Sequence, residues 1–140
     1  MFLLDTNVPS ELRRRERANR GLLQWAVATP VSELYLSVIS VMELELGVLL
    51  MERKDAAQGG VLRRWLEADV MSTFEGRILP VDVGVARCCA RLNAPDPKSE
   101  GDGYIAATAI VHGLTVVTRN ESDFASTGVA ILNPWSPPEP

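Results

Sequence analysis

The sequence predicts an α/β fold: a three-layer α/β/α sandwich around a central, mostly parallel sheet of four to five strands. Short apolar runs, each long enough for one strand, alternate with longer stretches whose apolar residues recur at helical spacing. Strands that alternate with helices favour right-handed βαβ crossovers and a sheet covered on both faces. Residues 114–117 are apolar nearly throughout, which is typical of a strand buried on both sides.

The strands are predicted where apolar runs lie between turn-forming residues. They are expected, in chain order, at residues 2–4, 34–37, 77–79, 114–117 and 129–132. Pro30 precedes the second run and favours a boundary there. The fifth run is short, so both a four-stranded and a five-stranded sheet remain open.

Helices are predicted in the intervals between these runs. They are expected from about residue 7, over 20–28, over about 40–51, up to about 74 after a loop containing Gly59 and Gly60, over about 82–92, and over about 100–112. Pro9 is compatible with a first helical turn. Gly113 favours a helix end after His112, and prolines at 95 and 97 break the structure before that helix.

A chain of 140 residues predicts one domain, here residues 1–133, followed by a Pro-rich tail over 134–140. The composition is 46% apolar and 23% charged, which is typical of a soluble globular protein. A net charge of −4 argues against a protein that coats nucleic acid by bulk attraction. It leaves open an enzyme that handles nucleic acid through a metal and a local basic stripe.

The sequence predicts a cytoplasmic protein that does not enter a membrane. No apolar run is long enough to span a bilayer, and Met1 leads directly into a predicted strand without a leader segment. The two cysteines, Cys88 and Cys89, are adjacent and poorly placed for an ordinary disulfide. We expect two reduced thiols on one helix.

Four acidic residues lie at the edges of these apolar elements: Asp5, Glu43, Asp102 and Asp123. A carboxylate in such a place is costly unless its charge is compensated. Each also has a plain explanation when taken alone. Asp5 could cap the next helix, Glu43 and Asp102 each follow a serine at the spacing of a capping box, and Asp123 could be a solvated loop residue.

Their positions relative to the predicted sheet favour a shared site. In an open parallel sheet, ligands bind beyond the carboxyl ends of the strands, where the strand order reverses. Asp5 ends the first strand and Asp123 follows the fourth, so all four acids converge if these strands are neighbours. Thr6, Thr118 and Asn120 would add supporting hydroxyl and amide groups. The sequence alone does not establish that the two strands are adjacent.

Four carboxylates in one pocket repel one another and create demand for a divalent cation. An all-oxygen site suits Mg²⁺, with Mn²⁺ as a substitute, better than Zn²⁺. Such a site typically supports phosphodiester hydrolysis, because the metal activates water and stabilises the leaving oxygen. One metal and two metals both remain open.

Other hydrolytic chemistries are poorly supplied. His112 is the only histidine, which excludes a two-histidine ribonuclease mechanism. The chain has no Gly-rich phosphate loop with a lysine and no G-x-S-x-G elbow. The basic run between Arg13 and Arg20 is either a solvated face or an edge that binds a nucleic-acid backbone.

In this order, these residues resemble the PIN-domain family, and in particular its VapC and FitB-like toxin branch. The resemblance rests on Leu4-Asp5-Thr6-Asn7, on 40–47 with Glu43, on 102–109, on 113–120 with Asp123-Phe124, and on 133–135. It implies an α/β/α sandwich with the first and fourth strands adjacent. It also implies Mg²⁺-dependent ribonuclease activity in which the four acids are catalytic and Asp5 and Asp102 ligate metal.

The resemblance further implies the toxic component of a type II toxin–antitoxin system that cuts RNA. Members are usually homodimers, neutralised by a small antitoxin whose tail occupies the groove near the active site. One alternative is a catalytically silent PIN-like protein that binds RNA or a regulatory partner. Another is a phosphatase of the haloacid dehalogenase type, which would want an aspartate where Asn7 stands.

Overall fold

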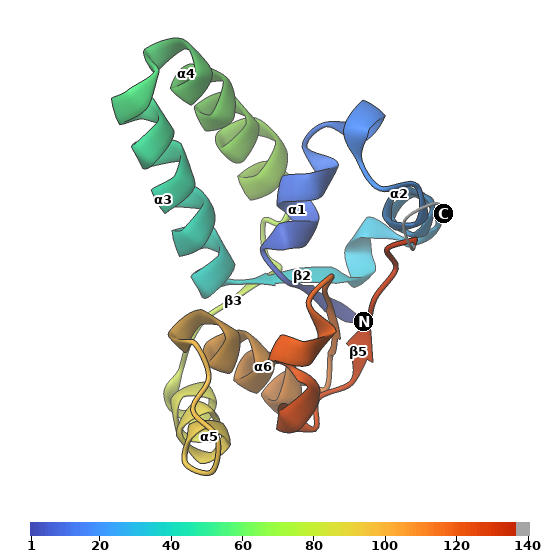
Figure 1. Ribbon diagram of the computed structural model, residues 1–140, viewed down its shortest axis with the longest axis vertical. Coiled ribbons are helices and arrows are strands. Elements are labelled where there is room, and N and C mark those ends of the chain that lie inside the picture. The colour runs from blue at the N-terminus through green and yellow to red at the C-terminus, as the bar shows by residue number, and fades with distance from the viewer. Residues whose placement is uncertain (137–140) are drawn as a thin grey trace.

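The computed structural model describes residues 1–136, which form one parallel sheet with helices on both faces (Figure 1). The strands are β1 (Phe2–Leu4), β2 (Leu34–Ser37), β3 (Ile78–Leu79), β4 (Thr115–Val117) and β5 (Ile131–Leu132), in the spatial order β3-β2-β1-β4-β5. Leu3 pairs with Tyr35 of β2 on one side and with Val116 of β4 on the other. The first and fourth strands are therefore neighbours, and the order of the strands reverses between them.

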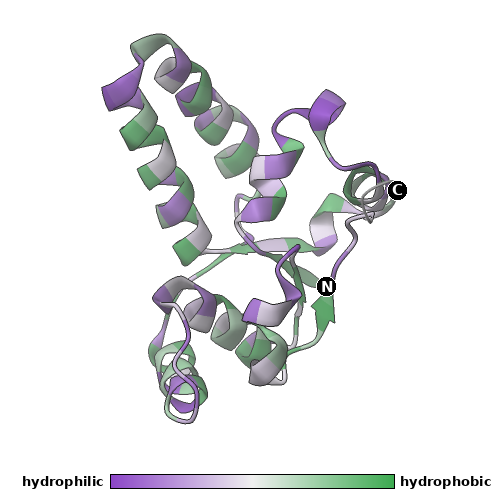
Figure 2. Ribbon diagram, viewed as in Figure 1, coloured by the Kyte–Doolittle hydropathy of each residue, from purple (hydrophilic) through white to green (hydrophobic). Residues whose placement is uncertain are grey.

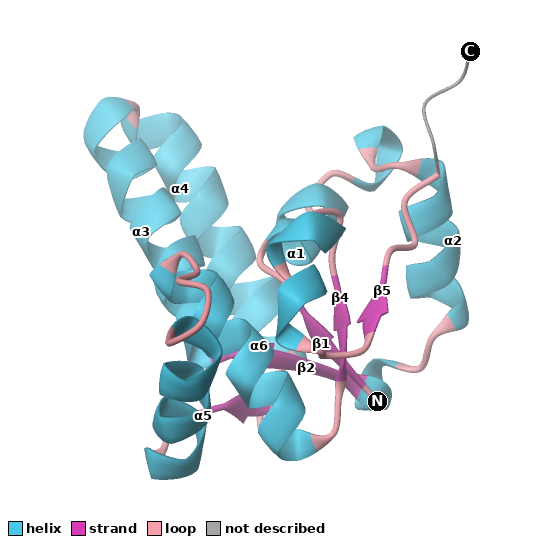
Figure 3. Ribbon diagram, turned by 60° about the horizontal axis from the view of Figure 1, so that its bottom comes forward, coloured by secondary structure: helices cyan, strands magenta, loops and turns pink. Residues whose placement is uncertain are grey.

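The helices form the two outer layers of the predicted sandwich (Figure 3). They are α1 (Asn7–Leu12), α2 (Arg20–Ala28), α3 (Val38–Lys54), α4 (Ala56–Arg64), α5 (Val83–Asn93) and α6 (Glu100–His112). Short 3₁₀ turns occupy Arg15–Arg17, Val31–Glu33, Glu121–Asp123 and Ala125–Thr127. The α/β/α fold class is confirmed, with all five expected strands present.

The strands bury apolar side chains on both faces, as their composition predicted. Leu3 and Val116 belong to the core beneath α6, whereas Leu4 and Val117 belong to the core beneath α1, α2 and α3. The split arises because successive side chains of a strand point to opposite faces. In Figure 2 strand β5 is green, and green and purple residues alternate along α3 and α4, as on helices with one apolar face. The sheet is thus held rigidly from both sides, and its carboxyl edge is a fixed platform.

Helices α3 and α4 form an antiparallel hairpin, which we call the α3–α4 arm (Figure 1). The predicted loop around Gly59 and Gly60 is wrong, since both glycines lie inside α4. The turn instead falls at Asp55. Its Oδ1 accepts hydrogen bonds from the backbone N–H groups of Ala57 and Gln58, each at 3.1 Å. Helix α4 then continues as a π-helix over Trp65–Met71.

Helix α3 begins two residues earlier than predicted and runs three residues further. Its N-cap is Ser37, whose Oγ accepts from the Ile39 N–H at 3.0 Å. The capping-box explanation for Glu43 is therefore wrong, and the carboxylate of Glu43 is left available for another partner. In α6, Ser99 is the N-cap residue but makes no side-chain capping bond.

The C-terminal part of the molecule matches the expected boundaries closely. Helix α6 ends at His112, and Gly113 follows with a φ of +67°, a left-handed conformation that glycine adopts without strain. Ser136 is tied to α2, because its N–H donates to Asn19 Oδ1 at 2.8 Å. A domain boundary at residue 133, with a Pro-rich tail over 134–140, stays a prediction, and residues 137–140 of that tail lie outside the described residues.

Two further expectations concern the thiols and membranes. Cys88 and Cys89 are free and buried in α5. Among the described residues, no helix combines the length and the apolar composition needed to cross a bilayer.

Candidate active site

Asp5 stands at the carboxyl end of the central strand, where its backbone N–H still donates to Val117 O of β4 at 2.9 Å. The side chain is 7% exposed. Its Oδ1 accepts from the Thr6 N–H at 2.8 Å, and its Oδ2 accepts from Thr118 Oγ1 at 2.8 Å and from Asn7 Nδ2 at 3.3 Å. Thr6 and Asn7, which follow β1, and Thr118, which follows β4, together fix the orientation of this carboxylate.

Burial raises the pKa of the Asp5 carboxyl, and the hydrogen bonds from Thr118 and Thr6 oppose that rise. The negative charges of Asp102 and Glu43 raise the pKa further. Glu43 lies in α3 and Asp102 in α6. Both charges act on Asp5 because the fold brings the starts of these two helices to the end of β1. A cation at this point would relieve the repulsion.

Glu43 is held by a short chain of hydroxyl groups. Thr6 Oγ1 lies 2.7 Å from Glu43 Oε1 and 2.9 Å from Ser40 Oγ. Thr6 has one hydroxyl hydrogen and an ionised carboxylate only accepts, so Thr6 donates to Glu43 and Ser40 donates to Thr6. Ser40 is fully buried. This series of hydrogen bonds therefore links the buried Ser40 hydroxyl, through Thr6, to the Glu43 carboxylate.

Asp102 lies in the first turn of α6 and lines a hollow of about 280 Å³ together with Asp123. Asp123 is exposed and ends a 3₁₀ turn. The start of α6 also approaches Glu43, because a Cβ added at Gly101 would lie 3.4 Å from Glu43 Oε2. Glu43 and Asp102 are thus near enough to Asp5 for their charges to act on it, and Asp102 and Asp123 line the same neighbouring hollow.

The expected supporting residues occupy different positions around Asp5. Thr118 is fully buried and bonds Asp5 directly, while Thr6 contacts both Asp5 and Glu43. Asn120 is exposed, and its backbone N–H donates to Thr118 Oγ1 at 2.9 Å. Asn120 therefore acts on this network through its main chain rather than through its amide.

Sequence reasoning missed two polar residues of the network, Ser40 and Asn7. Ser40 precedes Glu43 by almost one helical turn, and this spacing was interpreted as a capping signal although it also places both side chains on one helix face. Asn7 carries part of the family resemblance and argues against a phosphatase motif, but the sequence predicts no role for it at the site. Its Oδ1 is buried without a hydrogen-bond partner among the residues described.

The side chains at this edge fit a hard divalent cation in their chemistry. They offer carboxylate oxygens, the type of ligand that Mg²⁺ and Mn²⁺ prefer, without competing sulfur or imidazole. Within residues 1–136, no three acidic, histidine or cysteine side chains are close enough to form a complete metal cage. Waters and a substrate phosphate would have to supply the remaining ligands, which is usual for Mg²⁺.

A parallel sheet whose acids gather at the carboxyl edge, where the strand order reverses, defines an α/β/α domain with an acidic site at its switch point. The PIN domain family model matches residues 2–129. The chain belongs to the PIN-domain family.

The comparisons extend to full-length relatives. The chain is 41% identical to a VapC ribonuclease, Y4jK, of Sinorhizobium fredii, over 98% of this chain and 99% of that protein. It is 42% identical to the toxin FitB of Neisseria gonorrhoeae, over 96% and 99% of the two chains. A crystal structure of FitAcB from the same organism matches with a TM-score of 0.88 at 41% identity, covering 96% of this chain and 99% of that one.

Proposed function

We propose that this chain is the toxin of a type II toxin–antitoxin pair and hydrolyses RNA phosphodiester bonds with the help of Mg²⁺. The observation that carries the proposal is the meeting of the Asp5, Glu43 and Asp102 charges at the switch point of a PIN-domain sheet. The near full-length similarity to a VapC ribonuclease supports RNA as the substrate. VapC-type PIN ribonucleases are generally metal-dependent.

In this proposal Asp5 and Asp102 hold the metal, and Asp5 is kept in position by its three hydrogen-bond donors. Bound Mg²⁺, or Mn²⁺ in its place, supplies a more acidic water and stabilises charge on the leaving oxygen. Glu43 is the carboxylate best placed to orient the attacking water and accept its proton, since Thr6 and Ser40 fix it. Asp123 closes the site on the side of the α6 hollow.

The decisive experiment measures cleavage of total RNA by the purified protein with Mg²⁺ or Mn²⁺, and with a chelator. Asp5→Asn and Asp102→Asn should each lower the rate by at least about 100-fold while circular dichroism shows an unchanged fold. Glu75→Gln, which removes an exposed acid outside the site, is the matched control. RNA binding without any cleavage would instead favour the catalytically silent alternative.

The toxin role has a separate test, because a nuclease need not be a toxin. A cytoplasmic toxin requires a neutralising partner in the same cell, so a small protein encoded in the neighbouring reading frame should bind this chain. Expression of the wild-type chain alone should arrest growth, and co-expression of that partner should restore it. Growth arrest by Asp5→Asn to the same extent would contradict a toxicity that depends on RNA cleavage.

A second copy of the chain is part of the proposal. The outer face of α3 exposes the apolar residues Met42, Leu46, Leu49 and Leu50, opposite the buried Leu44 and Val48. An apolar stripe of this kind is typical of an interface. We therefore assign the homodimer contact to the outer face of α3.

A further inference from the structure

We infer that a hollow beside Glu43 is a pocket for one nucleobase of single-stranded RNA, adjacent to the phosphate that is cut. The inference rests on the proposed ribonuclease function and specifies how that site holds its substrate. The hollow has a volume of about 320 Å³ and lies between α1 and the α3–α4 arm. We call it the arm pocket. Its walls include Thr6, Arg13, Glu43, Leu44, Gly47 and Trp65.

The arm pocket adjoins the acid site through Thr6 and Glu43. Thr6 and Glu43 line the pocket and are also joined by the 2.7 Å hydrogen bond that fixes the Glu43 carboxylate. A group bound in the pocket is therefore next to the Glu43 carboxylate, whose charge also acts on Asp5. A phosphate bound by those carboxylates through a metal would leave its neighbouring nucleoside at the mouth of the pocket.

The lining suits a base rather than a metal or a small anion. Leu44 is buried and forms part of an apolar wall, and Trp65 is half-buried with part of its indole available for contact. Bases stack on aromatic side chains with little dependence on sequence. Trp65 is the first residue of the π-helix, and such irregular turns occur frequently at functional sites.

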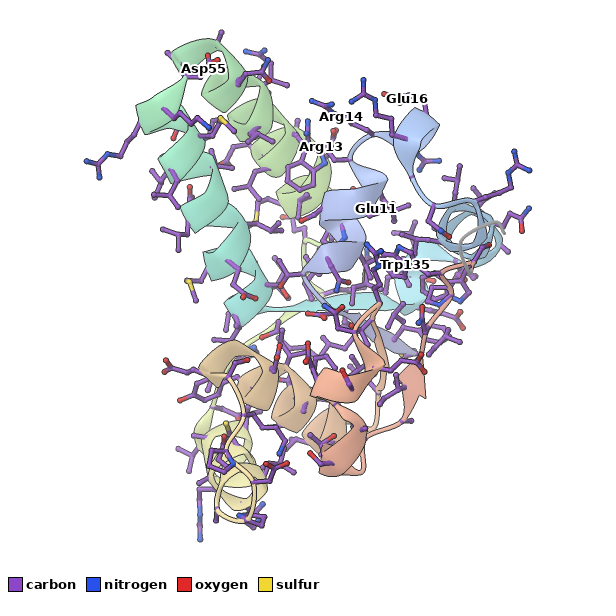
Figure 4. The ribbon with its side chains drawn as sticks, in the orientation of Figure 1. Glu11, Arg13, Arg14, Glu16, Asp55 and Trp135 are labelled. Atoms are coloured by element: carbon purple, nitrogen blue, oxygen red, sulfur yellow. The ribbon has the colours of Figure 1, made fainter. Side chains whose placement is uncertain are left out.

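A basic side chain stands at the opposite wall. Arg13 follows α1 and lines the pocket, and no carboxylate among the described residues lies within ion-pair distance of its guanidinium. Figure 4 shows Arg13 and Arg14 together at the end of α1 that faces α4. A guanidinium beside an apolar wall provides the two contacts that single-stranded RNA offers repeatedly, a phosphate and a base. The positive charge of Arg13 favours RNA as the occupant over a peptide that has no acidic residues.

Gly47 keeps the pocket open. It lies in α3 one turn after Glu43, and a Cβ added there would meet nothing within 4 Å. Glycine in the middle of a helix is unfavourable compared with any unbranched residue, so its presence here is not explained by helix stability. Gly47→Leu would place a side chain in the pocket without a clash in the backbone.

The test compares Gly47→Leu with Gly60→Leu, a matched control. Gly60 also lies inside a helix of the arm with room for a Cβ, but it is not part of the pocket wall. The first measurement is the affinity of the protein for a pool of fluorescent RNA octamers of mixed sequence, with a chelator present so that the RNA is not cut. Gly47→Leu should bind at least about tenfold more weakly than wild type, the loss of roughly one base stack, and Gly60→Leu should bind as wild type does.

The second measurement uses an RNA with one mapped cleavage site and an abasic position on either side of it. Wild type should cut one of the two abasic RNAs about tenfold more slowly than the intact RNA. Gly47→Leu should cut that abasic RNA and the intact RNA at the same rate. Equal abasic effects in the two proteins would overturn the inference. So would unchanged RNA binding by Gly47→Leu together with lost binding of the partner protein, which would assign the pocket to a peptide.

The two proposals fail in different ways. Wild-type protein that binds the octamers but does not cut RNA contradicts the ribonuclease function, and in that case a selective loss of binding by Gly47→Leu still supports the pocket. RNA cleavage by wild type with no difference between Gly47→Leu and Gly60→Leu overturns the pocket alone.

Discussion

Asp5 combines a buried position with two neighbouring acids and three hydrogen-bond donors. The donors stabilise its charged form, whereas burial and the charges of Asp102 and Glu43 oppose it, and burial is the largest influence on its pKa. The carboxylate is thus fixed in orientation by hydrogen bonds, while its surroundings destabilise its negative charge. A residue in this state gains more from a divalent cation than an exposed aspartate does.

This balance predicts how stability depends on pH in the absence of metal. Because the folded pKa of Asp5 lies above its ordinary value of 3.8, the folded state binds the proton more tightly than the unfolded chain. The contribution of Asp5 to the free energy of unfolding is therefore greatest below that value. It is lost as the pH rises through the folded pKa.

Asp5→Asn removes this titration. The free energy of unfolding of Asp5→Asn minus that of wild type should become more positive as the pH rises from about 4 to about 7, when urea unfolding is followed in a chelator. The geometric effect of the amide adds an offset that does not vary with pH. A difference that stays constant across this range would contradict the argument, and added Mg²⁺ should stabilise wild type alone at the upper end.

The hydroxyl chain from Ser40 predicts a second effect at the residue scale. Ser40→Ala removes the donor to Thr6 and loosens the Glu43 carboxylate, so the cleavage rate should fall by about tenfold, equivalent to about 1.4 kcal/mol. Stability should fall by about 1 kcal/mol. The measurements are kcat on a defined RNA and urea unfolding.

Ser37→Ala is the matched control. It also removes a fully buried hydroxyl at the start of α3, and as the loss of an N-cap it should cost about 1 kcal/mol of stability. Among the described residues, the Ser37 hydroxyl bonds the Ile39 N–H and forms no hydrogen bond with Thr6, so kcat should stay near the wild-type value. An equal loss of kcat in both variants would reduce Ser40 to a purely structural residue.

At the scale of elements, the α3–α4 arm depends on close packing between its two helices. Arg63 of α4 lies 2.6 Å from Glu45 and 3.0 Å from Glu52 of α3, and it also reaches Glu67. Gly59 lets the helices approach, since a Cβ there would be 2.5 Å from Glu52 Cα. The arm carries Glu43 at its base, so its rigidity contributes to the position of that carboxylate.

The two adjacent glycines of α4 should therefore respond oppositely to the same substitution. Gly59→Ala forces the backbones apart and should lower the free energy of unfolding by more than about 1 kcal/mol despite the higher helix propensity of alanine. Gly60→Ala meets only the end of the Arg64 side chain at 3.8 Å and should raise stability by about 0.5–1 kcal/mol. Thermal unfolding of the two variants decides the matter, and stabilisation of both would contradict the packing argument.

At the scale of the whole molecule, the outer face of α3 predicts the oligomeric state. Leu46 is 50% exposed in the centre of the apolar stripe, and a stable interface needs about 800 Å² from each partner. Leu46→Glu places a charge in that contact and should convert a dimer to a monomer in analytical ultracentrifugation. Val83→Glu, at an apolar residue that is 74% exposed on α5, should leave the mass unchanged. A dimer that survives Leu46→Glu must use another face.

The order of the elements and most of their boundaries were predictable from the sequence. Helix α2 spans the predicted residues and α6 ends where Gly113 indicates, because apolar periodicity and capping act within a few residues of chain. The loop predicted at Gly59 was wrong for a related reason. Local preference treats glycine as a break, whereas contact with a second helix can require it.

The four acids, their expected place at the ends of strands and helices, and the resemblance that suggests a nuclease were all available from the chain alone, whereas the roles of Ser40 and Asn7 were not. The pairing of β1 with β4, which lets Thr118 bond Asp5 across 113 residues of chain, is visible only in the folded molecule. The fold also decided that Ser40 holds Glu43 through Thr6 and that Gly47 opens onto a pocket. Local periodicity carries no information about which distant segments meet, because those contacts depend on how all the apolar surfaces are buried together.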